Sequence, residues 1–296
     1  MSAMKHIDPA TLPAPDFYRL LNSSIGPRPI AFASTIDAAG RVNLSPFSFF
    51  NVFGSNPPTL VFSPVITRHG THKNTLDNLN DVQEVTISVV TYGMVEQMSR
   101  ASADYPRGVN EFAKAGFTEV ASDKVRPPRV GESPVSYECI VNQIIVTGTD
   151  PGAGNLVICE IVQSHFDETI FNEKGAIDPH KLDLIGRLGG DWYVRASGDA
   201  LFEVARPQIG IGVDALPAAI RQSAILTGND LGKLGSYPAL PSADEVVGYR
   251  QSGVLDELFD EARYGCQYLP DLLHARARQL LAGNKVNEAW LTLLQV

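Results

Sequence analysis

The chain has 296 residues, of which 44% are apolar and 19% charged, and its 24 basic and 33 acidic residues give a formal net charge of −9. This length and apolar fraction predict a folded protein of one or two domains and exclude a disordered chain. The acidic balance argues against a nucleic-acid-binding protein, and no apolar run is long enough for a transmembrane helix, so we expect neither a nucleic-acid nor a membrane partner.

The N-terminal segment and the cysteines indicate the compartment. Residues 1–16 contain three prolines and no apolar stretch, which is not the pattern of a secretory signal. The three cysteines, Cys139, Cys159 and Cys266, are far apart and odd in number, which is typical of a reducing compartment. We therefore expect a cytoplasmic protein without a disulfide framework.

The first two thirds of the chain are rich in predicted β-strands. Six stretches combine apolar or alternating side chains with flanking turn residues: 29–36, 42–50, 59–63, 84–91, 138–147 and 156–163. Gly40 lies in the turn between the first two, where it can adopt a positive φ. The helices expected over 75–82, 93–102 and 109–115 do not alternate regularly with the strands, which disfavours a parallel doubly wound sheet. We predict a mainly β protein with a barrel.

The composition changes near Arg206 and Pro207, where β-branched alternation ends and Leu, Ala, Asp and Glu predominate. Helices are expected beyond this point over 216–223, 243–251, 254–263, 272–281 and 286–294. Ser242 and Glu245 have the spacing of a capping box. We therefore predict a barrel domain over residues 16–207 and a helical extension over 208–296, packed on the barrel or on a partner chain.

Several well-known catalytic motifs are absent from the sequence. It has no G-x-G-x-x-G after a strand, no G-x-S-x-G and no H-E-x-x-H. Residues 228–234 superficially resemble a phosphate-binding loop, but the stretch is one residue short and ends on Leu where a hydroxyl would contact magnesium. His69 and His72 lie three residues apart without a second pair of ligands, so no metal site is predicted.

A strand face that mixes polar and aromatic residues lies within residues 43–51. Period-two alternation places four side chains on this face: Asn43, Ser45, Phe47 and Phe49. Such a face suits a flat, mostly apolar ligand with polar edges. The alternative interpretation is a polar face at the barrel rim or at a subunit contact.

Cations and hydroxyls are concentrated in the following loop, residues 63–78. Arg68, Thr71, Lys73 and Thr75 lie within eight residues of one another, and the loop leads into a predicted helix near Thr75. The free N–H groups and the positive end of such a helix favour a phosphate. The alternative interpretation is a solvated basic loop.

A third motif, residues 185–193, has three glycines in five residues, which lets the backbone approach another group closely. Arg187 supplies a fixed cation, and Trp192 and Tyr193 are able to stack. The alternative interpretation is a tight turn before the last barrel strand.

Together these motifs resemble a known family. The segments G-P-R-P-I-A-F-A-S-T, N-L-S-P-F-S-F-F-N, N-P-P, K-N-T-L-D-N and R-L-G-G-x-x-Y occur in this order. They resemble the flavin reductase-like proteins, which are FMN-binding split barrels of the flavoredoxin and nitrilotriacetate monooxygenase component B type, over about residues 16–207. The resemblance implies a six-stranded antiparallel split barrel with a C-terminal α-helical extension, a homodimer, and FMN near the subunit interface.

The resemblance also implies site residues. Those expected along the isoalloxazine edge are Ser34, Thr35, Asn43, Ser45 and Ser48. Those expected at the phosphate are Ser63, Lys73 and Thr75, with Arg68 and His72 as helpers. Those expected to close the flavin or nicotinamide side are Arg187, Gly189, Gly190 and Tyr193. Relatives commonly have K-D-T where this chain has K-N-T, which leaves the lysine without a neighbouring carboxylate.

The activity implied by the resemblance is an NAD(P)H-dependent flavin reductase, in which hydride transfer belongs to the flavin. Backbone N–H groups of residues 43–48 are candidate donors to the ring, and Arg187 or a helix end is the candidate positive charge near N1 and O2. A partner monooxygenase or redox protein is the candidate recipient of electrons. Two alternatives stay open: an FMN electron carrier of the flavoredoxin type, and a relative that has lost its flavin and serves as a binding module.

Overall fold

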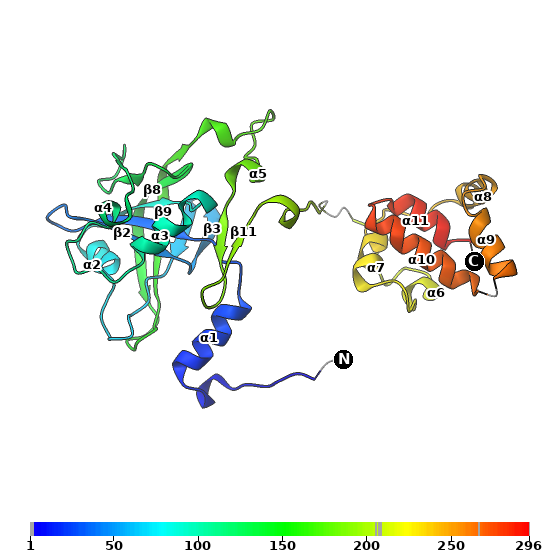
Figure 1. Ribbon diagram of the computed structural model, residues 1–296, viewed down its shortest axis with the longest axis horizontal. Coiled ribbons are helices and arrows are strands. Elements are labelled where there is room, and N and C mark those ends of the chain that lie inside the picture. The colour runs from blue at the N-terminus through cyan, green and yellow to red at the C-terminus, as the bar shows by residue number, and fades with distance from the viewer. Residues whose placement is uncertain (1–2, 205, 207–208, 266, 296) are drawn as a thin grey trace. The chain divides into compact units, whose positions relative to one another are not determined.

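The computed structural model describes residues 3–204, 206, 209–265 and 267–295 (Figure 1). The predicted domain boundary at 207–208 and the third cysteine, Cys266, lie outside the described residues. The chain divides into two compact units, Met1–Phe202 and Glu203–Val296. Within the described part of the chain, no helix has the length and apolar character needed to cross a bilayer.

The first unit is built on one antiparallel sheet with the strand order β2-β1-β5-β8-β9-β4-β3. Its strands are β1 (Ala31–Ile36), β2 (Val42–Phe47), β3 (Phe50–Ser55), β4 (Pro58–Phe62), β5 (Glu84–Ser88), β8 (Val135–Val146) and β9 (Asn155–Phe166). The antiparallel arrangement was predicted, but the sheet has seven strands rather than six. The difference arises because the stretch predicted as one strand, 42–50, ends as a strand at Phe47, and a further strand that was not predicted, β3, runs from Phe50 to Ser55.

The break between β2 and β3 explains how the sheet curves. Only Ser48 and Phe49 separate the two strands, yet β2 pairs with β1 at one edge and β3 pairs with β4 at the other. Strands that are consecutive in the chain but lie at opposite edges require the sheet to curl until its edges approach each other. The two edges therefore form the split of a barrel.

Helices of the first unit cover the β2–β1 side of the sheet, where α2 contacts β1 and α3 and α4 contact β2 (Figure 1). The helices are α1 (Ala14–Ser24), α2 (Asn74–Asp81), α3 (Val95–Ala101), α4 (Glu111–Ala115) and α5 (Pro179–Leu182). The predicted helices at α2, α3 and α4 are confirmed within a few residues, whereas α1 was not predicted. Short strands complete the unit: β6 (Glu119–Val120), β7 (Arg129–Val130), β10 (Ile185–Arg187) and β11 (Tyr193–Arg195).

Both faces of β1 are buried, because the barrel interior and α2 cover one and α3 and α4 cover the other. Ala33 belongs to a cluster with Phe62 of β4 and Leu79 of α2. Phe32 belongs to a second cluster with Phe112 of α4. Burial of such side chains contributes about 1.5–3 kcal/mol each, so β1 fixes α2 and α4 on the sheet.

The second unit is helical and has its own core. Its helices are α6 (Ala218–Arg221), α7 (Gly228–Gly235), α8 (Ala243–Gln251), α9 (Asp256–Tyr264), α10 (Leu269–Ala282) and α11 (Val286–Leu293). The capping box of Ser242 and Glu245 is confirmed at α8. Helix α7 was not predicted, because its glycines lower helix propensity. A second capping box, Thr227 with Asp230, and the burial of Leu234 stabilise α7.

Candidate functional site

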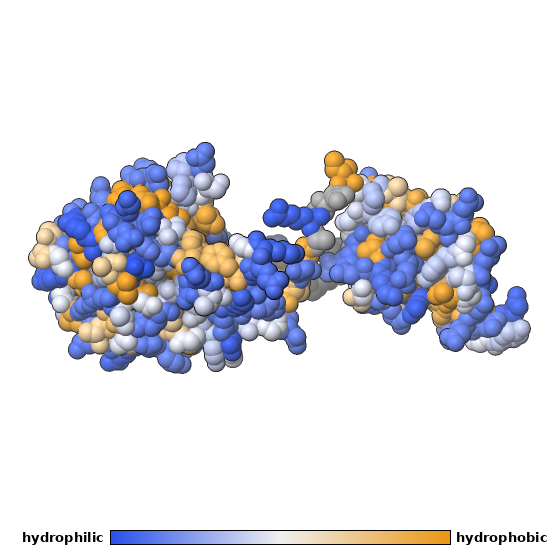
Figure 2. All heavy atoms as spheres, turned by 90° about the horizontal axis from the view of Figure 1, so that it is seen from above, coloured by the Kyte–Doolittle hydropathy of each residue, from blue (hydrophilic) through white to orange (hydrophobic). Residues whose placement is uncertain are grey.

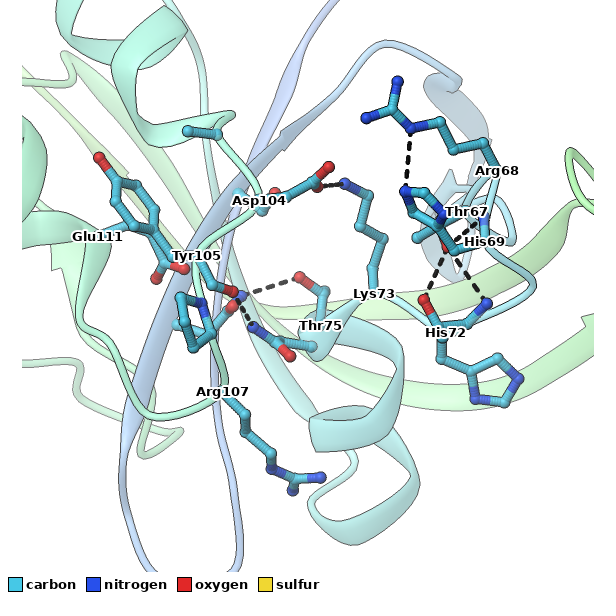
Figure 3. A pocket seen from close by; sticks show the side chains of 16 residues that line it. Thr67, Arg68, His69, His72, Lys73, Thr75, Asp104, Tyr105, Arg107 and Glu111 are labelled. Atoms are coloured by element: carbon cyan, nitrogen blue, oxygen red, sulfur yellow. Dashed lines mark hydrogen bonds and ion pairs between the residues drawn. The ribbon is translucent and has the colours of Figure 1, made fainter.

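A cavity of about 460 Å³ opens beside the N-terminus of α2 in the first unit (Figure 3). Four parts of the chain line it: β2, the loop 67–73, the first turn of α2, and the segment 103–111 that leads into α4. Its volume lies within the range of about 300–1,000 Å³ that is usual for small-molecule sites.

One end of this cavity is cationic and rich in hydroxyls. The side chains that give it this character are Thr67, Arg68, Thr71, Lys73 and Thr75. His69 lies beside Arg68, whereas His72 and Arg107 pair with Asp77 and Asp81 of α2. Lys73 occupies the N-cap position of α2, and no side chain caps this helix. The first N–H groups of α2 therefore have no side-chain acceptor. An uncapped helix N-terminus beside cations favours an anion.

The loop before α2 is held by its own hydroxyls. Thr67 Oγ1 accepts hydrogen bonds from the N–H groups of His69 (3.3 Å) and Thr71 (3.2 Å), and lies 2.7 Å from the Thr71 hydroxyl oxygen. Gly70 makes the turn with a φ of +74°, a value that glycine adopts without strain. The compact turn places Arg68 and His69 at the cavity.

A side-chain hydrogen bond links the strand β2 to the helix α2 at the cavity. The side-chain amide of Asn43 donates a 2.9 Å hydrogen bond to Thr75 Oγ1, and both side chains are buried. Ser45, on the same face of β2, also lines the cavity. The structure therefore brings together the polar strand face and the cationic loop, which are separate motifs in the sequence.

Glu111, at the start of α4, is a buried carboxyl in the cavity wall. Its Oε2 accepts the backbone N–H of Leu44 at 2.9 Å, and burial raises the pKa of the carboxyl above its ordinary value. The interaction removes the N–H of Leu44 from the predicted backbone donors over 43–48, and Pro46 has no N–H to donate.

A second, smaller hollow of about 160 Å³ is lined by chain neighbours of residues that line the first. Ser45 and Ala103 line the cavity, and their chain neighbours Pro46 and Ser102 line the hollow. Three predicted site residues meet in the hollow: Ser48, Arg187 and Tyr193. The guanidinium carbon of Arg187 lies 4.5 Å from the centre of the Tyr193 ring, and Arg187 Nη2 donates to the Gly190 carbonyl at 2.5 Å.

Gly189 and Gly190 form the 188–190 turn and line neither the cavity nor the smaller hollow. A Cβ atom on Gly189 would lie 2.1 Å from Ser23 Oγ, and Gly190 has a φ of +60°. Arg28 reinforces the same contact between α1 and the 188–190 turn, since it donates to the carbonyls of Ile25 (2.6 Å) and Leu188 (3.0 Å). The alternative interpretation of this motif, a tight turn, accounts for both glycines.

Three other predicted residues lie away from the cavity. Thr35 accepts a hydrogen bond from Asn78 Nδ2 beneath α2, and Ser63 accepts the N–H of Asn155 in the β8–β9 hairpin. Ser34 is fully buried in β1, and its hydroxyl has no partner among the described residues. The structure does not bring these side chains to the ligand space.

Sequence reasoning missed the residues that the 103–111 segment contributes to the cavity, which include Asp104, Tyr105, Arg107 and Glu111. Asp104 Oδ1 lies 2.5 Å from Lys73 Nζ, and this hydrogen bond, with the nearby cations, holds the pKa of Asp104 below its ordinary value. Asp104 thus gives Lys73 a carboxylate partner, which the neighbouring Asn74 of the K-N-T segment does not provide. The signal that could have found them is the segment D-Y-P-R-G, residues 104–108, which places acidic, aromatic and basic side chains together between two predicted helices.

A group of possible metal ligands, Asp123, Glu138 and His165, lies outside the cavity, with ligand atoms within 4.8 Å of one another. The Glu138 carboxylate is buried and accepts four hydrogen bonds: from the N–H groups of Asp123, Lys124 and Val125 and from His165 Nε2. These bonds use the acceptor capacity of both oxygens. We interpret the group as an anchor for the 121–127 loop.

Comparison with known proteins agrees with this architecture. The family model described as "Flavin reductase like domain" matches residues 24–179, more than half of the chain. The chain belongs to the flavin reductase-like family. The resemblance inferred from the motifs is thereby confirmed, and the matched region lies within the first unit.

Individual relatives align with 63–73% of this chain. An uncharacterized protein of Aquifex aeolicus is 35% identical over 187 residues, which are 63% of this chain and 93% of that protein. Among solved structures, nitrilotriacetate monooxygenase component B from Bacillus cereus is 30% identical, with a TM-score of 0.64 over 69% of this chain and 100% of its own. The 2-nitrobenzoate 2-nitroreductase NbaA of Pseudomonas fluorescens is 28% identical, with a TM-score of 0.62 over 73% and 100%.

Proposed function

We propose that this chain is an FMN-binding oxidoreductase that acts as an NAD(P)H-dependent flavin reductase. The observation that carries the proposal is the single cavity in which the polar face of β2 meets the cationic N-terminus of α2. Membership of the flavin reductase-like family supports flavin as the ligand.

The donor set at the cationic end fits the phosphate of FMN. Lys73 and Arg68 offer charged donors, Thr71 offers a hydroxyl, and the uncapped first turn of α2 offers backbone N–H groups. Riboflavin lacks the phosphate and gains nothing from these groups. The site should therefore prefer FMN over riboflavin.

The smaller hollow is the proposed place of the reacting end of the ligand. FMN supplies hydride acceptance when bound, so the protein need only hold the ring and stabilise developing negative charge. Arg187 provides a fixed cation there, and the Tyr193 ring beside it provides an apolar face. Ser48 contributes a hydroxyl to the same hollow.

The recipient of the electrons is proposed to be a partner monooxygenase or redox protein. The Bacillus cereus relative is named as component B of a monooxygenase, which supports a role as one part of a two-protein system. The Pseudomonas fluorescens relative is named as a nitroreductase, which supports reduction as the reaction class.

Rapid mixing of the FMN-loaded protein with NADH or NADPH tests the proposed function. The visible flavin absorbance should bleach with at least one of the two nicotinamides. A protein that binds FMN but is reduced by neither would instead be an electron carrier of the flavoredoxin type. A protein that takes up no FMN would be a binding module.

Arg187→Ala is expected to slow the bleaching about tenfold or more while changing the dissociation constant for FMN less, because its cation acts on charge that develops during reduction. Arg195→Ala is a suitable control, since Arg195 pairs with Asp183 and does not line the same hollow. An unaltered bleaching rate in Arg187→Ala would remove this role.

We also propose a homodimer, because large apolar side chains are exposed on the barrel unit. Phe53 and Val52 of the edge strand β3 are 69% and 63% exposed, and Val146 of β8 is 59% exposed. Figure 2 shows that apolar atoms are exposed on one face of the barrel unit. Sedimentation velocity should give the mass of two chains, and Phe53→Asp should shift the protein toward the monomer. A monomeric wild-type protein would contradict the proposal.

A further inference from the structure

We propose that Asp104 is a specificity-determining residue of the proposed FMN site: it is an internal anion that the flavin phosphate must displace from Lys73. The inference rests on the proposed function and extends it, since it concerns how tightly this chain holds FMN. It implies that FMN is exchangeable rather than permanently bound.

Asp104 occupies the place that the cavity offers to an anion. Its Oδ1 lies 2.5 Å from Lys73 Nζ, and Arg68 and His69 also act on its carboxylate electrostatically. All four residues line the same cavity (Figure 3). A phosphate bound at Lys73 and the uncapped turn of α2 would therefore meet a carboxylate already paired with its main cation.

The side chain of Asp104 is exposed and contacts Lys73, whereas its chain neighbours are anchored. Tyr105 accepts a 3.2 Å hydrogen bond from Asn74 Nδ2 through its carbonyl, and Arg107 pairs with Asp81 at 3.2 Å. The Asp104 side chain itself is 70% exposed and forms an ion pair with Lys73. Displacing the carboxylate thus requires a side-chain rotation and no rearrangement of the 103–107 segment.

The charge balance indicates the direction of the effect. Exposed ion pairs contribute little to stability, so a phosphate that also bonds to α2 can displace the carboxylate. The free energy of the broken Lys73–Asp104 ion pair is nevertheless subtracted from the binding of the phosphate. Asp104 therefore lowers the affinity for FMN without preventing its binding, and leaves the affinity for riboflavin unchanged.

Titration of flavin fluorescence with wild-type protein and Asp104→Asn tests the proposal without measuring activity. Asp104→Asn should bind FMN about fivefold more tightly, which corresponds to about 1 kcal/mol, and riboflavin with unchanged affinity. Asp150→Asn, which makes the same charge change at an exposed position outside the cavity, should match the wild type.

A double-mutant cycle distinguishes the ion pair from a general charge effect. In a Lys73→Ala background, Asp104→Asn should lose most of its fivefold gain. Equal or weaker FMN binding by Asp104→Asn, or a full gain in the Lys73→Ala background, would overturn the inference while leaving the proposed function intact. Absence of FMN binding by the wild type and by Asp104→Asn alike would overturn both.

Discussion

Lys73→Ala is expected to weaken FMN binding about 30-fold and to leave riboflavin binding unchanged. Lys73 lies at the N-cap of α2 with its ammonium group in the cavity, and a charge-assisted hydrogen bond contributes about 1.5–3 kcal/mol. A loss of about 2 kcal/mol corresponds to the expected change in the dissociation constant. Fluorescence titration with both flavins measures it.

Lys174→Ala is the matched control for this prediction, because Lys174 is exposed in a turn outside the cavity. It should bind FMN as the wild type does. If Lys73→Ala bound both flavins as tightly as the wild type does, or lost affinity for both to the same extent, the phosphate would not lie at α2.

Glu138→Gln is expected to lower the free energy of unfolding by about 3 kcal/mol. The buried carboxylate accepts three backbone N–H groups of the 121–127 loop and one from His165. An amide removes the charge and presents an NH₂ group to donors, which leaves buried N–H groups unsatisfied at about 1–3 kcal/mol each. Urea unfolding followed by circular dichroism measures the loss, and the exposed Glu173→Gln should change little.

The same carboxylate gives a pH dependence. Burial acts to raise the pKa of Glu138, but the hydrogen bonds from the loop backbone and His165 outweigh it and hold the pKa below its ordinary value. A carboxyl whose pKa is lower when folded stabilises the protein above its unfolded pKa, and this contribution is lost as the pH falls through the folded pKa. The stability difference between wild type and Glu138→Gln should therefore shrink in acid, and a difference that grows in acid would contradict this role.

The predicted site residues that the structure brings to one cavity are local in the chain. The cations, the hydroxyls and the helix start of the 67–75 region lie within ten residues, so their common location follows from backbone geometry alone. Alternation placed Asn43 and Ser45 on one face of β2, and both line the cavity. The capping box of α8 was also predictable because its two members are three residues apart.

The parts that the sequence did not predict depend on contacts between distant segments. Asp104 is 31 residues from Lys73, and no periodicity relates them. Thr35 lies opposite Asn43 in the β1–β2 register, but α2 covers that position, so burial excludes Thr35 from the cavity. The end of β2 at Phe47 and the separate strand β3 at the opposite edge follow from closure of the sheet, which depends on the whole barrel rather than on the local sequence.

A crystal structure of the protein grown with FMN tests the central claim most directly. We predict that the phosphate lies within hydrogen-bonding distance of Lys73 Nζ and the first N–H groups of α2, with the ring reaching the hollow of Arg187 and Tyr193. A phosphate bound elsewhere, or a flavin that leaves the space between β2 and α2 empty at saturating FMN, would contradict it.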